Sequence, residues 1–373
     1  MLGDSPVSKT ADVVIVGAGI VGAACARELT RAGLRVTVIE SRIPGGGATA
    51  AGMGHIVVMD DSEAQFQLTR LSQQLWAEAL PELPAGVEPL ACGTLWVAAD
   101  EEEMAEVERK RAFYSARQVP VEVLDAHQLA GAEPNLRPGL AGALRVPEDS
   151  VVYPPVATRA FLQGSAVVQA EVQCLAEGAA VLSDGSRMEG DIVVNATGAW
   201  ASKLTPEAPV RPRKGHLLIT DRYPGWVRHQ LVELGYLKSA HGSKADSVAF
   251  NVQPRATGQA LIGSSRQFGA TDPKIEPHML QWMLRRAVEY MPSIARLSGI
   301  RAWTGFRAAT PDSLPLIGPY QNSKRIYLAT GHEGLGITTC LGTAHVLAAQ
   351  LLGRASKIPV TPYLPSREHA PHA

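Results

Sequence analysis

A glycine-rich turn near the start of the chain has the residue types and spacing that bind a dinucleotide pyrophosphate. Gly17-Ala18-Gly19-Ile20-Val21-Gly22 fits the pattern G-x-G-x-x-G. Gly17 permits a tight turn, Gly19 lets backbone N–H groups approach a phosphate, and Gly22 allows close packing of the helix that follows. The alternative is a turn that needs glycine only for its shape.

The segments around this turn have the pattern of a strand, a helix and a second strand. Residues 13–16 are a continuous β-branched run, typical of a strand buried on both faces of a parallel sheet. Residues 23–32 read as a helix with small side chains, and residues 35–40 read as the next strand. Glu40 ends that strand, where a carboxylate accepts hydrogen bonds from ribose hydroxyls and repels the 2′-phosphate of NADP. The helix N-terminus adds partial positive charge for the phosphates, so we predict a dinucleotide site.

The next segment bears on which dinucleotide is bound. Residues 45–54 read Gly-Gly-Gly-Ala-Thr-Ala-Ala-Gly-Met-Gly, a run of mostly small side chains. Such a loop can bring backbone N–H groups and the Thr49 hydroxyl close to a long, extended ligand. The alternative is a solvent loop, but surface loops are usually more polar than this one.

The rest of the chain indicates a discontinuous two-domain protein. Residues 210–263 carry β-like runs that suggest an antiparallel sheet. Residues 325–329 read as a strand, followed by a glycine-rich turn and a last helix over 337–352. A strand–turn–helix unit therefore opens the chain and a similar one closes it, with a β-rich region between them.

Composition excludes several classes of protein. Lys+Arg 35 against Asp+Glu 36 leaves a net charge of −1, which argues against a nucleic-acid partner. The hydrophobic fraction of 46% is that of a globular chain rather than a disordered one. The four cysteines are too far apart for a disulfide framework or a metal ligand set, so no metal is expected. Residues 1–10 lack a signal peptide's apolar core, and residues 13–26 are too short to span a membrane, which predicts a cytoplasmic protein.

Four separated motifs resemble one enzyme family. They are residues 14–22 with Glu40 and 45–54; residues 191–200, Asp-Ile-Val-Val-Asn-Ala-Thr-Gly-Ala-Trp; residues 303–307, Trp-Thr-Gly-Phe-Arg, with 310–318; and residues 331–338, Gly-His-Glu-Gly-Leu-Gly-Ile-Thr. Together they resemble the FAD-dependent amino-acid oxidase (DAO) superfamily, which includes glycine oxidase, sarcosine oxidase and D-amino-acid dehydrogenases. The resemblance covers nearly the whole chain.

The resemblance implies an α/β fold, with a glutathione-reductase-like Rossmann FAD domain and a second α+β substrate domain built on an antiparallel sheet. The FAD domain is expected from residues 1–80, 145–208 and 305–373, and the substrate domain from residues 81–144 and 209–304. FAD is expected to be non-covalent, because the family's Cys or His attachment contexts are missing. The N-terminus of the last helix is expected to face the flavin N1–C2=O edge, where negative charge develops on reduction.

The residues that the resemblance assigns to FAD lie at six places in the sequence. They are Gly17, Gly19, Ile20 and Gly22; Glu40 and Ser41; Gly47, Ala48, Thr49, Ala51, Gly52 and Met53; Val172, with Ala196, Gly198 and Trp200; and Gly331, His332, Gly334, Leu335, Gly336, Ile337 and Thr338.

Three further residues are candidates for contact with the substrate. The family's arginine that matches Arg307 grips the substrate carboxylate, and a planar guanidinium suits a bidentate pair; the alternative is a surface arginine in a strand. Asn251 stands where glycine oxidase-like members have a tyrosine, and Gly334 stands where another such member has an arginine, which argues against glycine as the substrate. His55 is a candidate proton handler near the flavin ring, or a structural histidine.

Residues 48–55 and the short chain look most like the flavoprotein subunits of bacterial hetero-oligomeric dehydrogenases, such as the β subunit of D-hydroxyproline dehydrogenase. This implies dehydrogenation of an amino or imino acid at Cα, with electrons passed to partner subunits or another non-oxygen acceptor. Two alternatives stay open. One is a free-standing glycine, sarcosine or D-amino-acid oxidase that makes hydrogen peroxide, and the other is a flavin-binding assembly subunit without its own catalysis.

Overall fold

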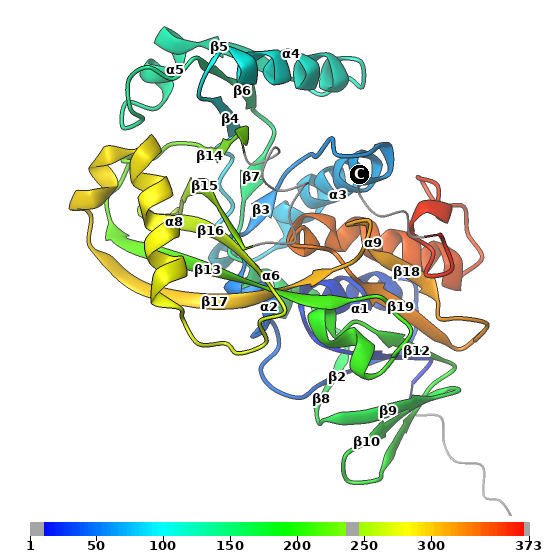
Figure 1. Cartoon of the computed structure of the whole chain (residues 1–373). Coiled ribbons are helices and arrows are strands. Elements are labelled where there is room, and N and C mark those ends of the chain that lie inside the picture. Colours follow the sequence, from blue (N-terminus) through cyan, green and yellow to red (C-terminus); the bar gives the residue numbers. More distant parts are fainter. Residues whose placement is uncertain (1–10, 236–245, 369–373) are drawn as a thin grey trace, which may run out of the picture. The chain divides into compact units, whose positions relative to one another are not determined.

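The computed structural model describes residues 11–235 and 246–368, which divide into two units of discontinuous sequence (Figure 1). Unit 1 contains residues 11–50, 155–211 and 308–368. Unit 2 contains residues 51–154, 212–235 and 246–307. The expectation about residues 1–10 lies outside the described residues.

Unit 1 is built on a six-stranded sheet in the order β18-β19-β12-β1-β2-β8. All pairs are parallel except β18–β19, which is antiparallel. The buried β-branched run near the start of the chain forms β1, a strand inside this sheet, and each of its four residues is buried. The strands are β1 (Val13–Val16), β2 (Val36–Glu40), β8 (Ala166–Gln169), β12 (Ile192–Asn195), β18 (Leu316–Pro319) and β19 (Ile326–Thr330).

Two helices from opposite ends of the sequence pack against each other in unit 1. Helix α1 (Ile20–Arg31) and helix α9 (Gly336–Leu351) meet through small side chains, which let the two backbones come close. The buried positions of α1 include Gly22, Ala23 and Ala26. The smaller elements are α2 (Ala48–Ala51), α6 (Pro154–Phe161), the 3-10 turn η3 (Gly198–Lys203), and a sheet of β9 (Val172–Ala176), β10 (Ala179–Leu182) and β11 (Arg187–Glu189).

Unit 2 is built on an eight-stranded sheet in the order β17-β13-β16-β15-β14-β4-β6-β5. The pairings from β13 to β5 are antiparallel except β14–β4. Its strands are β4 (Thr94–Ala98), β5 (Glu122–Asp125), β6 (Gly142–Val146), β13 (Arg211–Arg222), β14 (Gln230–Glu233), β15 (Ser247–Pro254), β16 (Gln259–Phe268) and β17 (Gly299–Ala309). A separate pair is formed by β3 (His55–Ile56) and β7 (Ser150–Val151).

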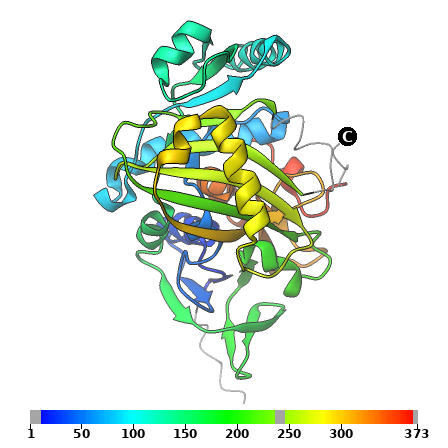
Figure 2. The same cartoon turned by 60° about the vertical axis from the view of Figure 1, so that its left-hand side comes forward.

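Helix α8 (Pro277–Tyr290) lies across one face of this sheet (Figure 2). Its buried residues are Met279, Met283, Ala287 and Tyr290, spaced so that they share one side of a helix. Tyr290 stacks on Phe250 of β15, with ring centroids 4.5 Å apart. The other helices of unit 2 are α3 (Glu63–Ala79), α4 (Glu101–Ser115) and α5 (Ala126–Ala132).

The predicted fold class, an α/β fold with a second, largely antiparallel sheet, is confirmed. The unit boundaries differ from the expected domain boundaries, because residues 51–80 and 145–154 group with unit 2. The physical reason is packing: Phe66 of α3 lies in one core cluster with Trp96 of β4, and β3 pairs with β7. In the described part of the chain, no helix is both long and apolar enough to cross a membrane.

Candidate functional site

The turn between β1 and α1, together with the start of α1, needs glycine at two positions. Gly17 has φ +105°, and a Cβ atom added there would lie 2.6 Å from the carbonyl oxygen of Ala196. A Cβ atom at Gly22 would lie 2.0 Å from the carbonyl oxygen of Gly17. At Gly19, by contrast, the only heavy atom within 4 Å of an added Cβ among the described residues is Thr49 Oγ1, at 3.5 Å. The turn is therefore tight on its inner side and open at Gly19, as a phosphate-binding turn must be.

Two side chains order the backbone around this turn. The Ile20 N–H donates to Thr49 Oγ1 at 3.0 Å, so Thr49 of α2 holds the start of α1. The Ala18 N–H donates to Glu40 Oε2 at 2.9 Å, while the Arg42 N–H and the Ser41 hydroxyl donate to Glu40 Oε1 at 3.0 and 3.4 Å. A carboxylate has about four acceptor positions. Glu40 is thus fixed at the end of β2 and keeps capacity for hydroxyl donors.

The turn after β12 is held by Asn195. Its Nδ2 donates to the Ala201 carbonyl at 3.0 Å, and its Oδ1 accepts from the Thr197 hydroxyl at 2.7 Å. Gly198 has φ +61°, and its carbonyl accepts from the Thr330 hydroxyl of β19 at 3.0 Å. Ala196 lies beside the glycine turn, against Gly17, while Gly198 and Trp200 belong to the 3-10 turn η3 that follows. Val172, the expected adenine contact, begins β9 and packs against the core cluster that contains Val14, Val16 and Ile39.

The N-terminal turn of α9 lies against that of α1. A Cβ atom added at Gly336, the first residue of α9, would be 3.6 Å from Val21 Cγ2. The approach to α9 uses left-handed backbone at Gly331 (φ +80°), Glu333 (φ +52°) and Gly334 (φ +121°). Within the described part of the chain, neither N-cap residue, Gly19 or Leu335, makes a side-chain capping hydrogen bond, and at α1 the Ile20 N–H donates instead to Thr49 Oγ1. The N-terminal turns of α1 and α9, where the positive ends of the two helix dipoles lie, are therefore next to each other within unit 1.

His332 supports the turn before α9. Its Nε2 lies 2.9 Å from the hydroxyl of Thr343, which is inside helix α9. The side chain is buried, and desolvation lowers its pKa to about 3, so the imidazole is neutral at pH 7. The other predicted residues of this segment, Leu335, Ile337 and Thr338, form the cap and first turn of the helix.

These features fit an FAD molecule. The glycine turn leaves room for a pyrophosphate, Glu40 suits a ribose, and the second helix tip offers positive dipole potential for an electron-rich ring edge. Burial raises the pKa of the Cys340 thiol inside α9 well above its usual value, which keeps it unreactive. Among the described residues, no group of His, Cys, Asp or Glu side chains could hold a metal ion.

Three of the predicted cofactor residues, Ala51, Gly52 and Met53, group with unit 2 instead. Trp303 Nε1 donates to the Ala51 carbonyl at 3.3 Å, and a Cβ atom at Gly305 would lie 2.5 Å from Ala51 Cβ. Gln253 Nε2 donates to the Met53 carbonyl. The segment is therefore fixed against β17 and β15, on the sheet face opposite α8. Gly47 and Ala48, with Thr49, stay in unit 1.

Arg307 lies near the end of β17 on that same face. Its Nη1 donates to the Ser265 carbonyl at 2.9 Å, and its guanidinium occupies the space over Gly215, where an added Cβ would come within 2.5 Å of Nη1. Desolvation lowers the pKa of Arg307 to about 10, so the group remains charged at neutral pH. Among the described residues, no Asp or Glu lies within ion-pair distance of Arg307.

His55 and Asn251 are also in unit 2. His55 Nδ1 is hydrogen-bonded to Gln230 Oε1, so the ring donates there and Nε2 carries the lone pair. Desolvation, with repulsion from Arg307, lowers the pKa of His55 below its ordinary value and keeps it neutral. Asn251 pairs with Gly263 of β16, and its Oδ1 is buried without a hydrogen-bond partner among the described residues.

Sequence reasoning missed two arginines on neighbouring strands, Arg213 of β13 and Arg266 of β16. The only sequence signal was the basic run Arg211-Pro212-Arg213-Lys214, which reads equally well as a solvated strand end. Electrostatic repulsion from Arg307 contributes to lowering the pKa of both arginines.

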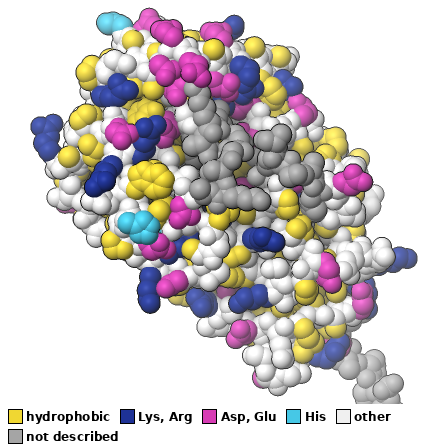
Figure 3. Space-filling view, in the orientation of Figure 1, with side chains coloured by type: hydrophobic (Ala, Val, Ile, Leu, Met, Phe, Trp, Pro, Cys, Tyr) yellow, Lys and Arg dark blue, Asp and Glu magenta, His cyan; other side chains and the backbone are white. Residues whose placement is uncertain are grey.

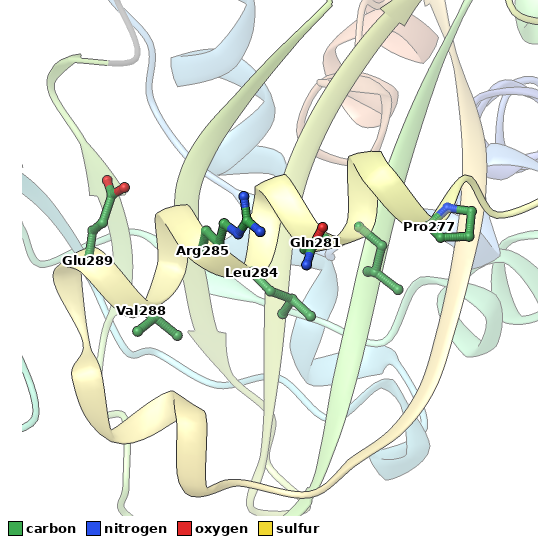
Figure 4. A pocket seen from close by; sticks show the side chains of 7 residues that line it. Pro277, Gln281, Leu284, Arg285, Val288 and Glu289 are labelled. Carbon is green, nitrogen blue, oxygen red and sulfur yellow. The ribbon is translucent and has the colours of Figure 1, made fainter.

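A shallow apolar groove lies elsewhere on unit 2, along the outer side of α8 (Figure 4). It is lined by Pro277, Leu280, Gln281, Leu284, Arg285, Val288 and Glu289. None of the predicted site residues lines it. Figure 3 shows Lys, Arg, Asp and Glu side chains interspersed over the visible face rather than one large patch of a single sign.

Comparison with known proteins gives the class. Residues 12–350 match the family model DAO, described as FAD dependent oxidoreductase. The chain therefore belongs to the DAO family of FAD-dependent oxidoreductases, and the predictions of an FAD enzyme of this family, with non-covalent FAD, are confirmed.

Individual relatives are similar over nearly their whole length. Hydrogen cyanide synthase subunit HcnC of Pseudomonas protegens is 28% identical, covering 96% of each chain. Glycine oxidase of Pseudomonas aeruginosa is 28% identical, covering 95% of this chain and 98% of the relative. Among solved structures, glycine oxidase from Geobacillus kaustophilus (TM-score 0.86, 24% identity, 96% and 99% covered) and L-proline dehydrogenase from P. horikoshii (TM-score 0.85, 24%, 96% and 97%) share the fold.

Proposed function

We propose that the chain dehydrogenates an amino or imino acid at its CH–NH bond, with FAD bound by unit 1 and the substrate carboxylate bound by Arg307 of unit 2. This assigns the FAD domain of the sequence analysis to unit 1 and the substrate domain to unit 2. When bound, FAD accepts the hydride that leaves Cα. Relatives named glycine oxidase and L-proline dehydrogenase support a substrate of this class.

The observation that carries the proposal is the environment of Arg307. One guanidinium nitrogen is held by the Ser265 carbonyl, which fixes the plane of the group, and no described carboxylate pairs with it. A fixed, partly buried guanidinium is a bidentate site for a carboxylate. Such a contact would hold Cα in one position and reduce the entropic cost of reaching the reactive geometry.

Two further side chains of unit 2 suit the amine. Asn251 Oδ1 is a buried acceptor that an amine N–H would satisfy. His55 is kept neutral by desolvation, and a neutral imidazole is a candidate to take the proton that a substrate ammonium must lose before Cα gives up a hydride. No strong side-chain base is needed beyond this.

The test is substitution of Arg307. Arg307→Ala should retain bound FAD and raise KM for the amino acid by about 100-fold, since a buried charged hydrogen-bonded pair contributes about 3 kcal/mol. Arg307→Lys should be intermediate, because an ammonium cannot make the bidentate contact. Loss of the flavin with KM unchanged would contradict the assignment of Arg307.

The narrower candidate is a D-hydroxyproline dehydrogenase subunit that passes electrons to partner subunits in the cytoplasm. The name of HcnC, a subunit of hydrogen cyanide synthase, supports a partner-dependent arrangement. Anaerobic bleaching of the flavin by D-hydroxyproline, and co-purification of neighbouring polypeptides from the soluble cell fraction, would support it.

The oxidase alternative is favoured by the several glycine oxidases among the relatives. This alternative predicts that the isolated chain produces hydrogen peroxide as fast as it reduces an electron-accepting dye. The assembly-subunit alternative predicts that no amino or imino acid bleaches the flavin at all.

A further inference from the structure

Arg367 of unit 1 uses every N–H donor of its guanidinium group, which has five in a fixed planar arrangement. Nε and Nη2 donate to the two carboxylate oxygens of Asp312, at 2.7 and 2.9 Å, and so form a bidentate ion pair. The other three N–H groups donate to the carbonyls of Leu314 at 2.8 Å, Pro315 at 2.9 Å and Leu364 at 3.2 Å. The ion pair is largely buried, with 9% of the Arg367 side chain and 13% of the Asp312 side chain exposed. Arg367 therefore fixes a loop that lies about 55 residues earlier in the sequence.

The segment that carries Arg367 is itself docked on unit 1. It begins with the 3-10 turn η5 (Thr361–Tyr363), in which the Tyr363 side chain is fully buried. The residues after this turn cover Gly318 of β18, because a Cβ atom added at Gly318 would lie 3.0 Å from Leu364 Cδ2 and 3.3 Å from Pro365 Cδ. The backbone on both sides of this loop contact is thus held in place, and Arg367 is a fixed anchor rather than a surface side chain.

The loop that Arg367 fixes, residues 310–315, has a backbone conformation that needs such support. Ser313 has φ +56°, in the left-handed region, which a residue other than glycine adopts only where its surroundings impose it. Within the loop, the Thr310 hydroxyl donates to the Leu314 carbonyl at 2.8 Å, and the Leu314 N–H donates to Asp312 Oδ1 at 3.2 Å. Arg367 binds the same carboxylate and the same carbonyl from outside the loop, so it holds this conformation together.

The loop 310–315 and the residues just before it hold the turn that leads into α9. The Glu333 N–H donates to the Ala308 carbonyl at 2.9 Å. A Cβ atom added at Gly331 would lie 2.6 Å from Thr310 Cγ2, so the Thr310 side chain packs directly on the turn. Because Gly331, Glu333 and Gly334 all have left-handed backbone, the shape of the turn depends on these outside contacts. The contacts thus connect Arg367, through one loop, to the N-terminal end of α9.

We propose that Arg367 is a positioning residue for the flavin. By fixing the loop 310–315, it keeps the turn 331–335 in the shape that brings the N-terminus of α9 to the N1–C2=O edge of the bound ring. Negative charge develops at that edge when the flavin is reduced, so displacement of the helix end destabilises the reduced form more than the oxidised form. Arg367 thereby raises the reduction potential of the bound flavin. This inference rests on the proposed function, in which unit 1 binds FAD.

The first experiment measures the reduction potential of the flavin in the holoenzyme of Arg367→Gln, by titration with a chemical reductant and a reference dye. This measurement needs no amino acid. The equilibrium constant for two-electron reduction should fall about tenfold, which corresponds to about 30 mV. The matched control is Arg35→Gln, which removes another bidentate pair of unit 1, between Arg35 and Asp12, with distances of 3.3 and 2.8 Å. These two residues directly precede β2 and β1, at the strand ends opposite the glycine turn, so the control should keep the wild-type potential.

The second experiment separates positioning from the charge of Arg367 itself. Asp312→Asn removes a negative charge, so a direct electrostatic effect on the flavin predicts a higher reduction potential. Positioning predicts the opposite, a lower potential, because the amide can no longer accept both charge-assisted hydrogen bonds from Arg367. Arg367→Lys keeps the positive charge and has only three N–H donors, so it should lower the potential nearly as much as Arg367→Gln does.

The outcomes distinguish this inference from the proposed function. A lower Tm with an unchanged potential in Arg367→Gln would show a role in stability alone and would overturn the inference, as would a higher potential in Asp312→Asn. If Arg367→Gln does not fold, the sign of the shift in Asp312→Asn decides. A flavin whose potential shifts as expected, but which no amino or imino acid reduces, would support the role of Arg367 and overturn the proposed dehydrogenation. A chain that binds no FAD would overturn both.

Discussion

His332 is a buried imidazole whose protonation should couple to folding. Its pKa is lowered to about 3 in the folded chain, against about 6.5 when unfolded. The unfolded state binds more protons between these values. The contribution to stability is therefore complete above pH 6.5 and falls by about 1.4 kcal/mol for each pH unit below it.

His332→Gln can keep a hydrogen bond to Thr343 and cannot titrate. We expect the difference in unfolding free energy between this variant and the wild type to shift in favour of the variant as the pH falls from 6.5 to 4.5. Urea unfolding at several pH values measures it. A difference that does not change with pH would show that His332 is protonated in the folded chain.

The ionisation of Asp149 makes the stability of the folded chain depend on pH in the opposite direction. It is fully buried, its Oδ1 accepts from the Val58 N–H at 3.2 Å and from Gln73 Nε2 at 3.0 Å, and burial raises its pKa to about 7. The folded state holds the proton more tightly than the unfolded state, so this contribution is complete below pH 3.8 and is lost as pH rises to 7.

Asp149→Asn should therefore be relatively more stable than the wild type at pH 8 than at pH 4. Thermal unfolding at both pH values tests this. Glu148→Gln, at the neighbouring and partly exposed position, is a suitable control, and an equal response in both variants would contradict the assignment.

At the scale of elements, the turn between β1 and α1 admits no side chain at Gly22. A Cβ atom there would lie 2.0 Å from the Gly17 carbonyl oxygen, so Gly22→Ala must displace the helix start. We expect Gly22→Ala to be purified without flavin absorbance. Gly131→Ala, where an added Cβ meets no heavy atom within 4 Å, should keep full flavin content. Normal flavin content in Gly22→Ala would remove the turn from the FAD site.

The same scale shows what local sequence patterns can predict. Strand β1, helix α1 and helix α9 lie within a few residues of the expected positions. The spacing of hydrophobic residues and the glycines that end an element are local signals, so the sequence alone predicts them. The grouping of Arg213 and Arg266 with Arg307 depends on the pairing of strands far apart in sequence, which periodicity does not encode. The association of residues 51–53 with β17 was missed for the same reason.

At the scale of the whole molecule, non-covalent FAD links cofactor binding to stability. A ligand that binds only the folded state stabilises it by RT ln(1 + [L]/Kd), about 2.7 kcal/mol at 100 times Kd. We expect excess FAD to raise Tm, and denaturation in acid to release the flavin into solution. NADP should leave Tm unchanged, because Glu40 opposes a 2′-phosphate. Flavin that stays with the precipitated chain would contradict the non-covalent site.

The interleaved strand order of unit 1 has a consequence for biosynthesis. Strand β12 is flanked by β1 (Val13–Val16) and by β19 (Ile326–Thr330), which lie about 310 residues apart in the sequence, and α1 is covered by α9. On the ribosome, the segment β1-α1-β2 must remain without β19 and α9 until residue 351 has been synthesised. Ribosome stalling before residue 326 should thus leave a protease-sensitive, chaperone-binding intermediate, even though its first two hundred residues are already outside the exit tunnel.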